Sequence, residues 1–154
     1  IMVECHSNNI NIDGNMIDFS RITQSISNPI QSIACISIYK GNENNKIILI
    51  KNNSLYSFES FSCISVSPFT ENLIIDSNSC NGNIGITTFE TLVNQMKLLQ
   101  ISNNTLYHDS KNIGIVLGNL LYKNVIVKGN IISCRYQNIS KIYYKRNYYY
   151  PTYF

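Results

Sequence analysis

The chain is poor in charge, in glycine and in proline, and it contains no tryptophan. Charged residues make up 14% of the 154 residues, against roughly 25% in a typical soluble domain. Asparagine and serine provide the polar surface instead. Because the surfaces of cytosolic enzymes are usually richer in lysine and glutamate, this composition favours an extracellular or virion-surface protein, with an intracellular assembly as the alternative location.

The scarce residues share a property at the codon level. Gly, Ala, Pro and Arg together supply 14 residues, whereas Ile, Asn, Lys, Tyr, Phe and Met supply 78. The scarce set has G/C-rich codons and the abundant set has A/T-rich codons. We therefore expect an A/T-rich coding sequence, which is typical of large DNA viruses, some RNA viruses, certain protists and organelle genomes.

Long apolar runs are also missing. The longest, residues 113–122, is broken by Gly118 and Asn119 and falls far short of the ~20 residues that a membrane span requires. The start, Ile1-Met2-Val3-Glu4-Cys5, lacks a basic region followed by an apolar one, so we expect a secretory signal to be absent or removed. A chain of this length predicts a single domain, residues 1–154, with a substantial core.

The five cysteines are scattered and form no CxxC pair of the kind that binds zinc or performs redox chemistry. An odd number permits at most two intramolecular disulfides. Buried reduced thiols are the alternative, because free cysteine is among the most buried residue types. The disulfide candidates are Cys5, Cys35, Cys63, Cys80 and Cys134.

Three Asn-X-Ser/Thr sequons occur, at Asn52, Asn103 and Asn138. In a chain so rich in Asn and Ser, two or three would arise by chance. The first two lie in polar turns where a glycan would fit, and the third follows an apolar strand.

Most of the chain is predicted to form short strands separated by Asn/Gly/Ser turns. The strands are expected at residues 33–39, 46–50, 54–58, 61–66, 73–75, 113–117, 121–127 and 131–136, with another near 11–19. Turn signals every 8 to 12 residues are typical of a sandwich or barrel. We therefore predict a mainly β fold, an antiparallel sandwich or barrel, in which residues 33–50 form a hairpin; α+β is the alternative.

Two local resemblances accompany this prediction. Residues 113–133 resemble the Asn/Gly-punctuated strands of parallel β-helices, but one or two such coils are too few to fold as a solenoid and we identify no internal repeat. Residues 33–50 resemble hairpins of interleukin-1-like β-trefoils through generic hairpin residues only, so this resemblance implies nothing about function.

One segment has a helical pattern. In residues 87–100, Phe89, Leu92, Val93, Met96 and Leu99 recur at the spacing of one helix face, and Thr87 with Glu90 resembles a capping box. We predict one amphipathic helix over residues 87–100 that packs on a sheet; an exposed partner-binding helix is the alternative.

Charge and tyrosine are unevenly distributed. All nine acids lie at or before Asp109, while residues 110–154 hold seven basic residues and eight of the eleven tyrosines. Tyrosine and arginine are enriched at interface hot spots, so this part predicts a binding surface; a terminal strand packed on its neighbour is the alternative. The predicted partner-binding residues are Tyr143, Tyr144, Lys145, Arg146, Tyr148, Tyr149 and Tyr150.

Catalysis fits the sequence least well. His108 with Cys134 could in principle activate a thiolate, but no nucleophile motif, metal-ligand spacing or phosphate loop is present. We predict a non-catalytic binding module without cofactor or metal, a viral or parasite secreted or surface protein that binds a host protein. The alternative is an RNA-contacting or assembly-embedded structural protein that uses the basic C-terminal part, with nucleic acid or an acidic glycan as partner.

Overall fold

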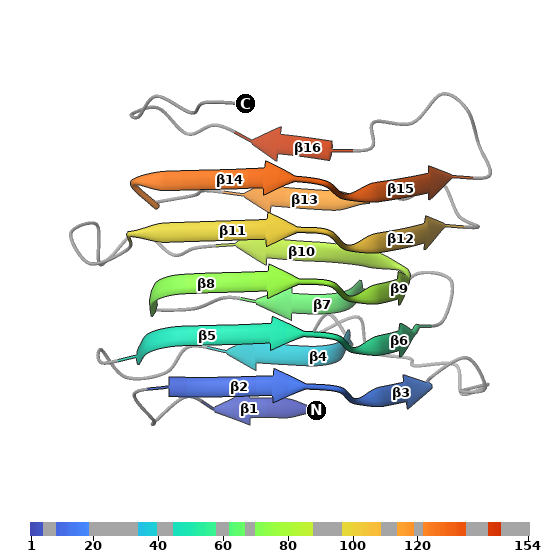
Figure 1. Cartoon of the computed structure of the whole chain (residues 1–154), viewed down its shortest axis with the longest axis horizontal. Helices are drawn as coiled ribbons and strands as arrows, with labels where there is room; N and C mark the ends of the chain where they lie inside the picture. Colours follow the sequence, from blue (N-terminus) through green and yellow to red (C-terminus); the bar gives the residue numbers. More distant parts are fainter. Residues whose placement is uncertain are drawn as a thin grey trace, which may run out of the picture.

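The computed structural model describes residues 1–4, 9–18, 34–39, 45–57, 62–66, 70–87, 97–108, 114–118, 122–134 and 142–145. These residues form sixteen strands and, within those ranges, no helix. The strands belong to three sheets, named A, B and C here, in which all the described pairings are parallel (Figure 1).

The strands of each sheet are given in their spatial order. Sheet A contains β1 (Met2–Glu4), β4 (Ala34–Tyr39), β7 (Ser62–Val66), β10 (Asn83–Thr87), β13 (Ile115–Gly118) and β16 (Ile142–Lys145). Sheet B contains β14 (Asn124–Lys128), β11 (Leu98–Ser102), β8 (Thr70–Asp76), β5 (Asn45–Lys51) and β2 (Asn9–Asp13). Sheet C contains β15 (Ile131–Cys134), β12 (Thr105–His108), β9 (Ser79–Asn81), β6 (Ser54–Tyr56) and β3 (Met16–Asp18).

The chain visits sheets A, B and C in turn and then repeats the circuit, so each strand pairs with the strand three places further along. One circuit is a coil. Coil 1 is β1–β3, coil 2 is β4–β6, coil 3 is β7–β9, coil 4 is β10–β12, coil 5 is β13–β15, and β16 adds a sixth strand to sheet A (Figure 1). This stacking of coils is a parallel β-helix, a solenoid in which each repeat contacts its neighbours in the stack.

The predicted antiparallel sandwich or barrel is therefore wrong, although most of the predicted strands exist. The predicted hairpin over residues 33–50 is wrong too, because β4 belongs to sheet A and β5 to sheet B. Apolar residues alternate with polar ones along these strands, which usually indicates an antiparallel sheet with one wet face. In this solenoid the same alternation arises because each sheet has the core on one side and its outer face on the other.

The predicted helix over residues 87–100 is also corrected. Thr87 ends β10, and residues 98–100 lie in β11; residues 88–96 lie outside the described residues. Leu99 is fully buried while Leu98 is only half-buried, which is the alternation of a strand. A short apolar run satisfies both the helical and the strand period, so Leu99 fitted the predicted helical stripe.

An internal repeat is present, contrary to the sequence analysis. It spans each passage from sheet B to sheet C and is illustrated by residues 48–55, Ile-Leu-Ile-Lys-Asn-Asn-Ser-Leu. The first, third and last residues point into the core, and the second asparagine is also buried. Equivalent segments begin at Ile10, Leu73, Leu99 and Val125, as the strand register shows.

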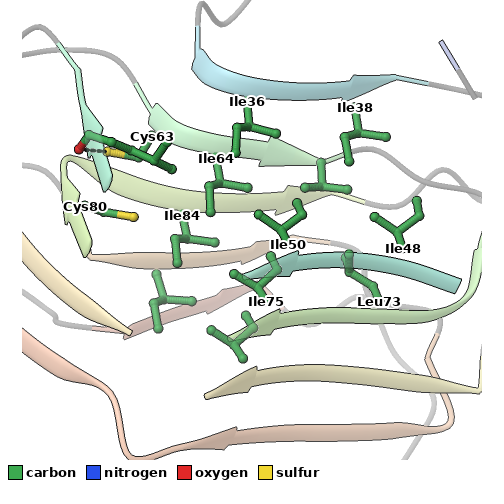
Figure 2. Packing of buried hydrophobic residues seen from close by; sticks show 14 of the residues in the cluster. Ile36, Ile38, Ile48, Ile50, Cys63, Ile64, Leu73, Ile75, Cys80 and Ile84 are labelled. Carbon is green, nitrogen blue, oxygen red and sulfur yellow. Dashed lines mark hydrogen bonds between the residues drawn. The ribbon is translucent and has the colours of Figure 1, made fainter. Parts of the chain in front are cut away.

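The core is built from columns of inward side chains, one from each coil. Ile48, Leu73 and Leu99 are register neighbours in sheet B and are fully buried. Figure 2 shows Ile48, Ile50 and Ile75 of sheet B facing Ile36, Ile38 and Ile64 of sheet A. Burying a side chain of this size contributes about 1.5 to 3 kcal/mol, so these columns supply the main stabilisation of the coils.

The turn from sheet B to sheet C has the same two-residue form in every coil. Its first residue has a positive φ and is Gly14, Asn52, Ser77, Asn103 or Gly129. Gly and Asn adopt this left-handed conformation most readily, which explains their use here. Its second residue is an asparagine, at position 15, 53, 78, 104 or 130.

These second asparagines form a ladder along the solenoid. The backbone N–H of each donates to the Oδ1 of the next: Asn15 to Asn53 at 2.9 Å, Asn53 to Asn78 at 3.0 Å, Asn78 to Asn104 at 2.9 Å, and Asn104 to Asn130 at 3.0 Å. Asn53, Asn78 and Asn104 are buried. Because a buried polar group is costly unless it is paired, the ladder fixes the alignment of successive coils.

Candidate interaction surfaces

The outer face of sheet C carries two exposed tyrosines in one column. Tyr56 and Tyr107 are each in register with Asn81, which lies between them; these three residues are named the tyrosine column. The two tyrosines are 40% and 47% exposed. Two strand spacings separate them, about 9.5 Å along the solenoid. The column is therefore an aromatic surface whose spacing is set by the backbone.

Strand alternation explains why these tyrosines face outward. In β6 and β12 the preceding residues, Leu55 and Leu106, are fully buried in the core, so the next residue in each strand must point to the other face. The same register places Asp18 beside Tyr56 and Ser133 beside Tyr107. Polar neighbours thus flank the aromatic surface at both ends.

A second surface lies where the strands of sheet B end. Asp13, Lys51, Asp76, Ser102 and Lys128 are successive register neighbours there; they are named the charged row. The Lys51 Nζ lies 3.3 Å from the Asp13 Oδ2. Opposite charges are thus neighbours along the row, a pairing that favours this register.

The carboxylates of the charged row are held in their ionised form. Asp76 accepts hydrogen bonds from Ser102 Oγ at 2.5 Å, Ser77 Oγ at 2.9 Å and Asn103 Nδ2 at 3.0 Å. These donors, with the Ser102 hydroxyl foremost, lower the pKa of Asp76. A hydrogen bond from Asn52 is the main cause that lowers the pKa of Asp13. The two carboxylates of the row therefore stabilise the turns by accepting hydrogen bonds from turn residues.

Three of the five cysteines are buried free thiols: Cys35, Cys63 and Cys80. The Cys63 Sγ lies 3.5 Å from the Leu55 carbonyl oxygen (Figure 2). The pKa of Cys35 is raised by its contact with the Cys63 thiol and by burial, and that of Cys63 is also raised. Neutral buried thiols are poor nucleophiles. The predicted disulfides stay a prediction, because the structure shows only that these three thiols are unpaired.

The structure explains two of the three sequons. Asn52 and Asn103 are the left-handed turn residues, and the ladder asparagine and a Ser or Thr follow each of them. The repeat therefore generates the Asn-X-Ser/Thr pattern for a structural reason. Both side chains are exposed, and their Nδ2 atoms donate to Asp13 and Asp76 respectively. Glycosylation at these sites stays a prediction; Asn138 lies outside the described residues.

The predicted C-terminal surface is described only in part. Tyr143, Tyr144 and Lys145 lie in β16, the outermost strand of sheet A, where Tyr143 is in register with Val116 of β13. Arg146, Tyr148, Tyr149 and Tyr150 lie outside the described residues. The role of these seven residues in partner binding stays a prediction. Cys5 also lies outside the described residues.

His108 and Cys134 are brought together by the fold. They are register partners at the ends of β12 and β15, although 26 residues separate them in the sequence. Only their backbone positions are described. Among the described residues, no group of three or more His, Cys, Asp or Glu side chains is placed to hold a metal ion.

Sequence reasoning missed the tyrosine column and the ladder. Both depend on a period of 25 or 26 residues between ladder asparagines. The signal was an asparagine preceded by Gly, Asn or Ser and followed two residues later by an apolar residue. It was obscured because 38 residues separate Asn15 from Asn53.

No helix in the described part of the chain is long and apolar enough to cross a membrane.

Comparison of the chain with protein-family models, with curated proteins and with solved structures gave no match. The class of protein is therefore defined by the fold alone, a parallel β-helix. A fold does not by itself determine a function, so a function has to be argued from specific residues on its surface.

Proposed function

We propose that this chain is a non-catalytic binding module that engages a protein partner through the tyrosine column of sheet C. The observation that carries the proposal is the pair of half-exposed tyrosines, Tyr56 and Tyr107, held two strands apart on a rigid face. Tyrosine supplies a large contact area at little cost in rotamer entropy, and it is enriched among residues that dominate binding energy.

The surroundings of the column favour a protein over a polyanion. In the described part of sheet C, the register neighbours of the tyrosines are Asp18, Asn81 and Ser133, none of them basic. A surface that binds nucleic acid or an acidic glycan needs clustered Lys or Arg. Aromatic rings flanked by a carboxylate, an amide and a hydroxyl instead resemble the core and rim of a protein interface.

A host protein is the partner class that we propose, with the chain as a secreted or surface protein of a virus or parasite. The low charged fraction of 14% and the exposure of Asn52 and Asn103 support an extracellular location. Peptide mapping of protein purified from its natural source checks this: glycan at either asparagine supports the location, and unmodified sequons with five alkylated cysteines contradict it.

The binding proposal is tested by selecting partners from a displayed library of host extracellular domains. Tyr56→Ala or Tyr107→Ala should weaken binding of the selected domain by about 2 kcal/mol or more. Ile47→Ala is the matched control, because Ile47 is similarly exposed, at 41%, but lies on sheet B. Binding that survives both tyrosine changes, or that Ile47→Ala weakens equally, would overturn the assignment to this face.

A further inference from the structure

We propose that the tyrosine column recognises a proline-rich segment of its partner, bound in the polyproline II conformation and lying along the direction in which the coils stack. This inference rests on the proposed function, because it names the chemistry of the ligand at the same surface. It is carried by the distance between Tyr56 and Tyr107 and by the exposed polar side chains around them.

Backbone hydrogen bonds fix the distance between the two tyrosines, which lie in successive strands β6, β9 and β12 of sheet C (Figure 1). Ser57, which follows Tyr56, donates its backbone N–H at 3.2 Å and its Oγ at 2.8 Å to the carbonyl oxygen of Asn81. Gly82, which follows Asn81, donates its N–H to the carbonyl oxygen of Tyr107 at 3.0 Å. Because both gaps are bridged, the backbone that carries the rings loses little entropy when a ligand binds.

The distance between the tyrosines matches one turn of a polyproline II helix. Such a helix has three residues per turn and rises about 3.1 Å per residue, so residues i and i+3 lie on the same edge about 9.3 Å apart. The two strand spacings between Tyr56 and Tyr107 amount to about 9.5 Å. Two prolines three positions apart therefore each meet one ring. Proline also fixes φ, so the ligand is ordered before it binds.

Other peptide conformations fit the column less well. In an extended strand, side chains on one face recur about every 6.7 Å, so one lies too close and the next too far. In an α-helix, residues seven apart are about 10.5 Å apart, and an intervening residue of the same face lies over Asn81. That residue is usually apolar in a helix that docks on a surface, whereas Asn81 is polar.

Polar side chains on this face complement the backbone of the ligand. A polyproline II segment has no internal hydrogen bonds, so its carbonyl oxygens need donors. Asn81 lies between the two rings, is half-exposed and has two amide N–H donors. A second outward column, Ser54, Ser79 and Thr105, runs beside the first at about 6.7 Å and supplies hydroxyl donors.

Charge orients the ligand on the column. Asp18 is exposed and lies one strand spacing beyond Tyr56, about 4.8 Å. The described strands of sheet C contain no lysine or arginine. A basic ligand residue one or two positions outside the proline on Tyr56 is displaced by about 3 to 6 Å, so it reaches Asp18. A carboxylate accepts several hydrogen bonds, so this contact adds to those that Asp18 already makes.

Binding of a labelled peptide, Arg-Pro-Pro-Pro-Pro-Arg, to the full chain tests the inference by fluorescence anisotropy. Its first and fourth prolines have the required spacing. Tyr56→Asn/Asn81→Tyr keeps two tyrosines in the column but leaves them one strand spacing apart, about 4.8 Å, and should weaken binding at least about tenfold. A peptide with glycine in place of all four prolines keeps the charge and should not bind.

A second variant separates spacing from position. Tyr56→Asn/Asn81→Tyr/Tyr107→Asn/Ser133→Tyr moves both rings one coil along and restores their separation of two strand spacings. It should recover most of the affinity that the first variant loses. Circular dichroism confirms that both variants remain folded. Equal binding of the peptide by the parent and by both variants would contradict the inference, because spacing would then be irrelevant.

The same peptide distinguishes this inference from the proposed function. Spacing-dependent binding of the peptide, displaced by a domain selected from the displayed library, supports both. A selected domain that loses affinity on Tyr56→Ala, while the peptide neither binds nor competes at millimolar concentration, would overturn the polyproline ligand and leave the tyrosine column as a protein-binding surface. Stronger binding by a helical or an extended peptide than by the proline peptide would also overturn the inference.

Discussion

Asn78 shows how a polar side chain is made compatible with the interior of the solenoid. Its Nδ2 donates to the carbonyl oxygens of Ile50 at 3.0 Å and Asp76 at 3.1 Å and to Asn104 Oδ1 at 2.9 Å, and its Oδ1 accepts from Asn53. The donor and acceptor capacity of the amide is thereby used. Burial therefore costs little while the ladder is intact and much when it is broken.

We expect Asn78→Ala to lower the free energy of unfolding by about 2 to 4 kcal/mol, because it leaves the Asn53 N–H buried without its side-chain acceptor and removes the amide hydrogen bond to the Ile50 carbonyl oxygen. The matched control is Asn72→Ala, which removes one exposed hydrogen bond to the Lys46 carbonyl oxygen and should cost within ~0.5 kcal/mol. Urea unfolding monitored by circular dichroism measures both. Equal costs would show that the ladder contributes no more than a surface hydrogen bond.

Asp76 predicts a pH dependence. Its folded-state pKa is lowered, chiefly by the Ser102 hydroxyl, so its stabilisation is complete above the unfolded-state pKa of about 3.9. That stabilisation is lost as the pH falls through the lowered folded-state value. We expect Asp76→Asn to be less stable than the parent at pH 7, with the difference shrinking below about pH 4.

Unfolding in urea between pH 2 and pH 7 measures this difference. Ser102→Ala provides a second variant, because it removes the main donor and keeps the carboxylate. It should reduce the same acid-dependent contribution. A constant difference between Asp76→Asn and the parent across the range would mean that the carboxylate is not stabilised by these hydrogen bonds.

At the scale of the element, substitutions in β11 distinguish the observed strand from the predicted helix over residues 98–100. Leu98 and Leu99 are adjacent leucines in one strand, the first half-buried on the outer face and the second fully buried in the core. Leu99→Ala should cost about 2 to 5 kcal/mol, whereas Leu98→Ala should cost under about 1 kcal/mol.

Urea unfolding measures both variants. Because each replaces a leucine by alanine, a difference in cost reports only the position of the side chain. Ile101→Ala should behave like Leu99→Ala, because Ile101 is the next inward residue of β11 and is also fully buried. A large cost at Leu98, or a small cost at Ile101, would contradict the inward alternation of β11.

At the scale of the whole molecule, the solenoid converts the charge split of the sequence into an acidic first coil and a basic last coil among the described residues. Among the described residues, only three lysines lie in coil 5 and β16, which is few for a phosphate-binding surface. We expect a single-stranded oligonucleotide to bind no tighter than the non-specific range of about 10⁻⁴ to 10⁻⁶ M at physiological salt, and to weaken steeply as salt rises.

Fluorescence anisotropy of a labelled oligonucleotide over a salt series measures this binding. Lys123→Ala/Lys128→Ala should abolish what binding there is and leave binding of a protein partner to the tyrosine column unchanged. Tight oligonucleotide binding that the lysine pair abolishes would favour the alternative function, an RNA-contacting structural protein.

The sequence by itself determined that the chain forms many short strands separated by polar turns. Alternation such as Ile48, Ile50 and Ile10, Ile12, together with turn residues such as Gly14 and Asn52, is local information. It predicted strands near β4, β5, β7 and β15 and placed Asn52 and Asn103 in polar turns. Local patterns of this kind depend on neighbours a few residues away.

Only the tertiary structure decided how the strands pair. An alternating strand satisfies a parallel or an antiparallel neighbour equally well, and the choice here rests on contacts between residues 25 or more apart, such as the Asn53–Asn78 rung. The stacking of coils also places Leu99 in a core column rather than on a helix face. It brings Tyr56 and Tyr107 into one column with Asn81 between them. These contacts cannot be predicted from spacing along the sequence, because the residues become neighbours only when one coil stacks on another.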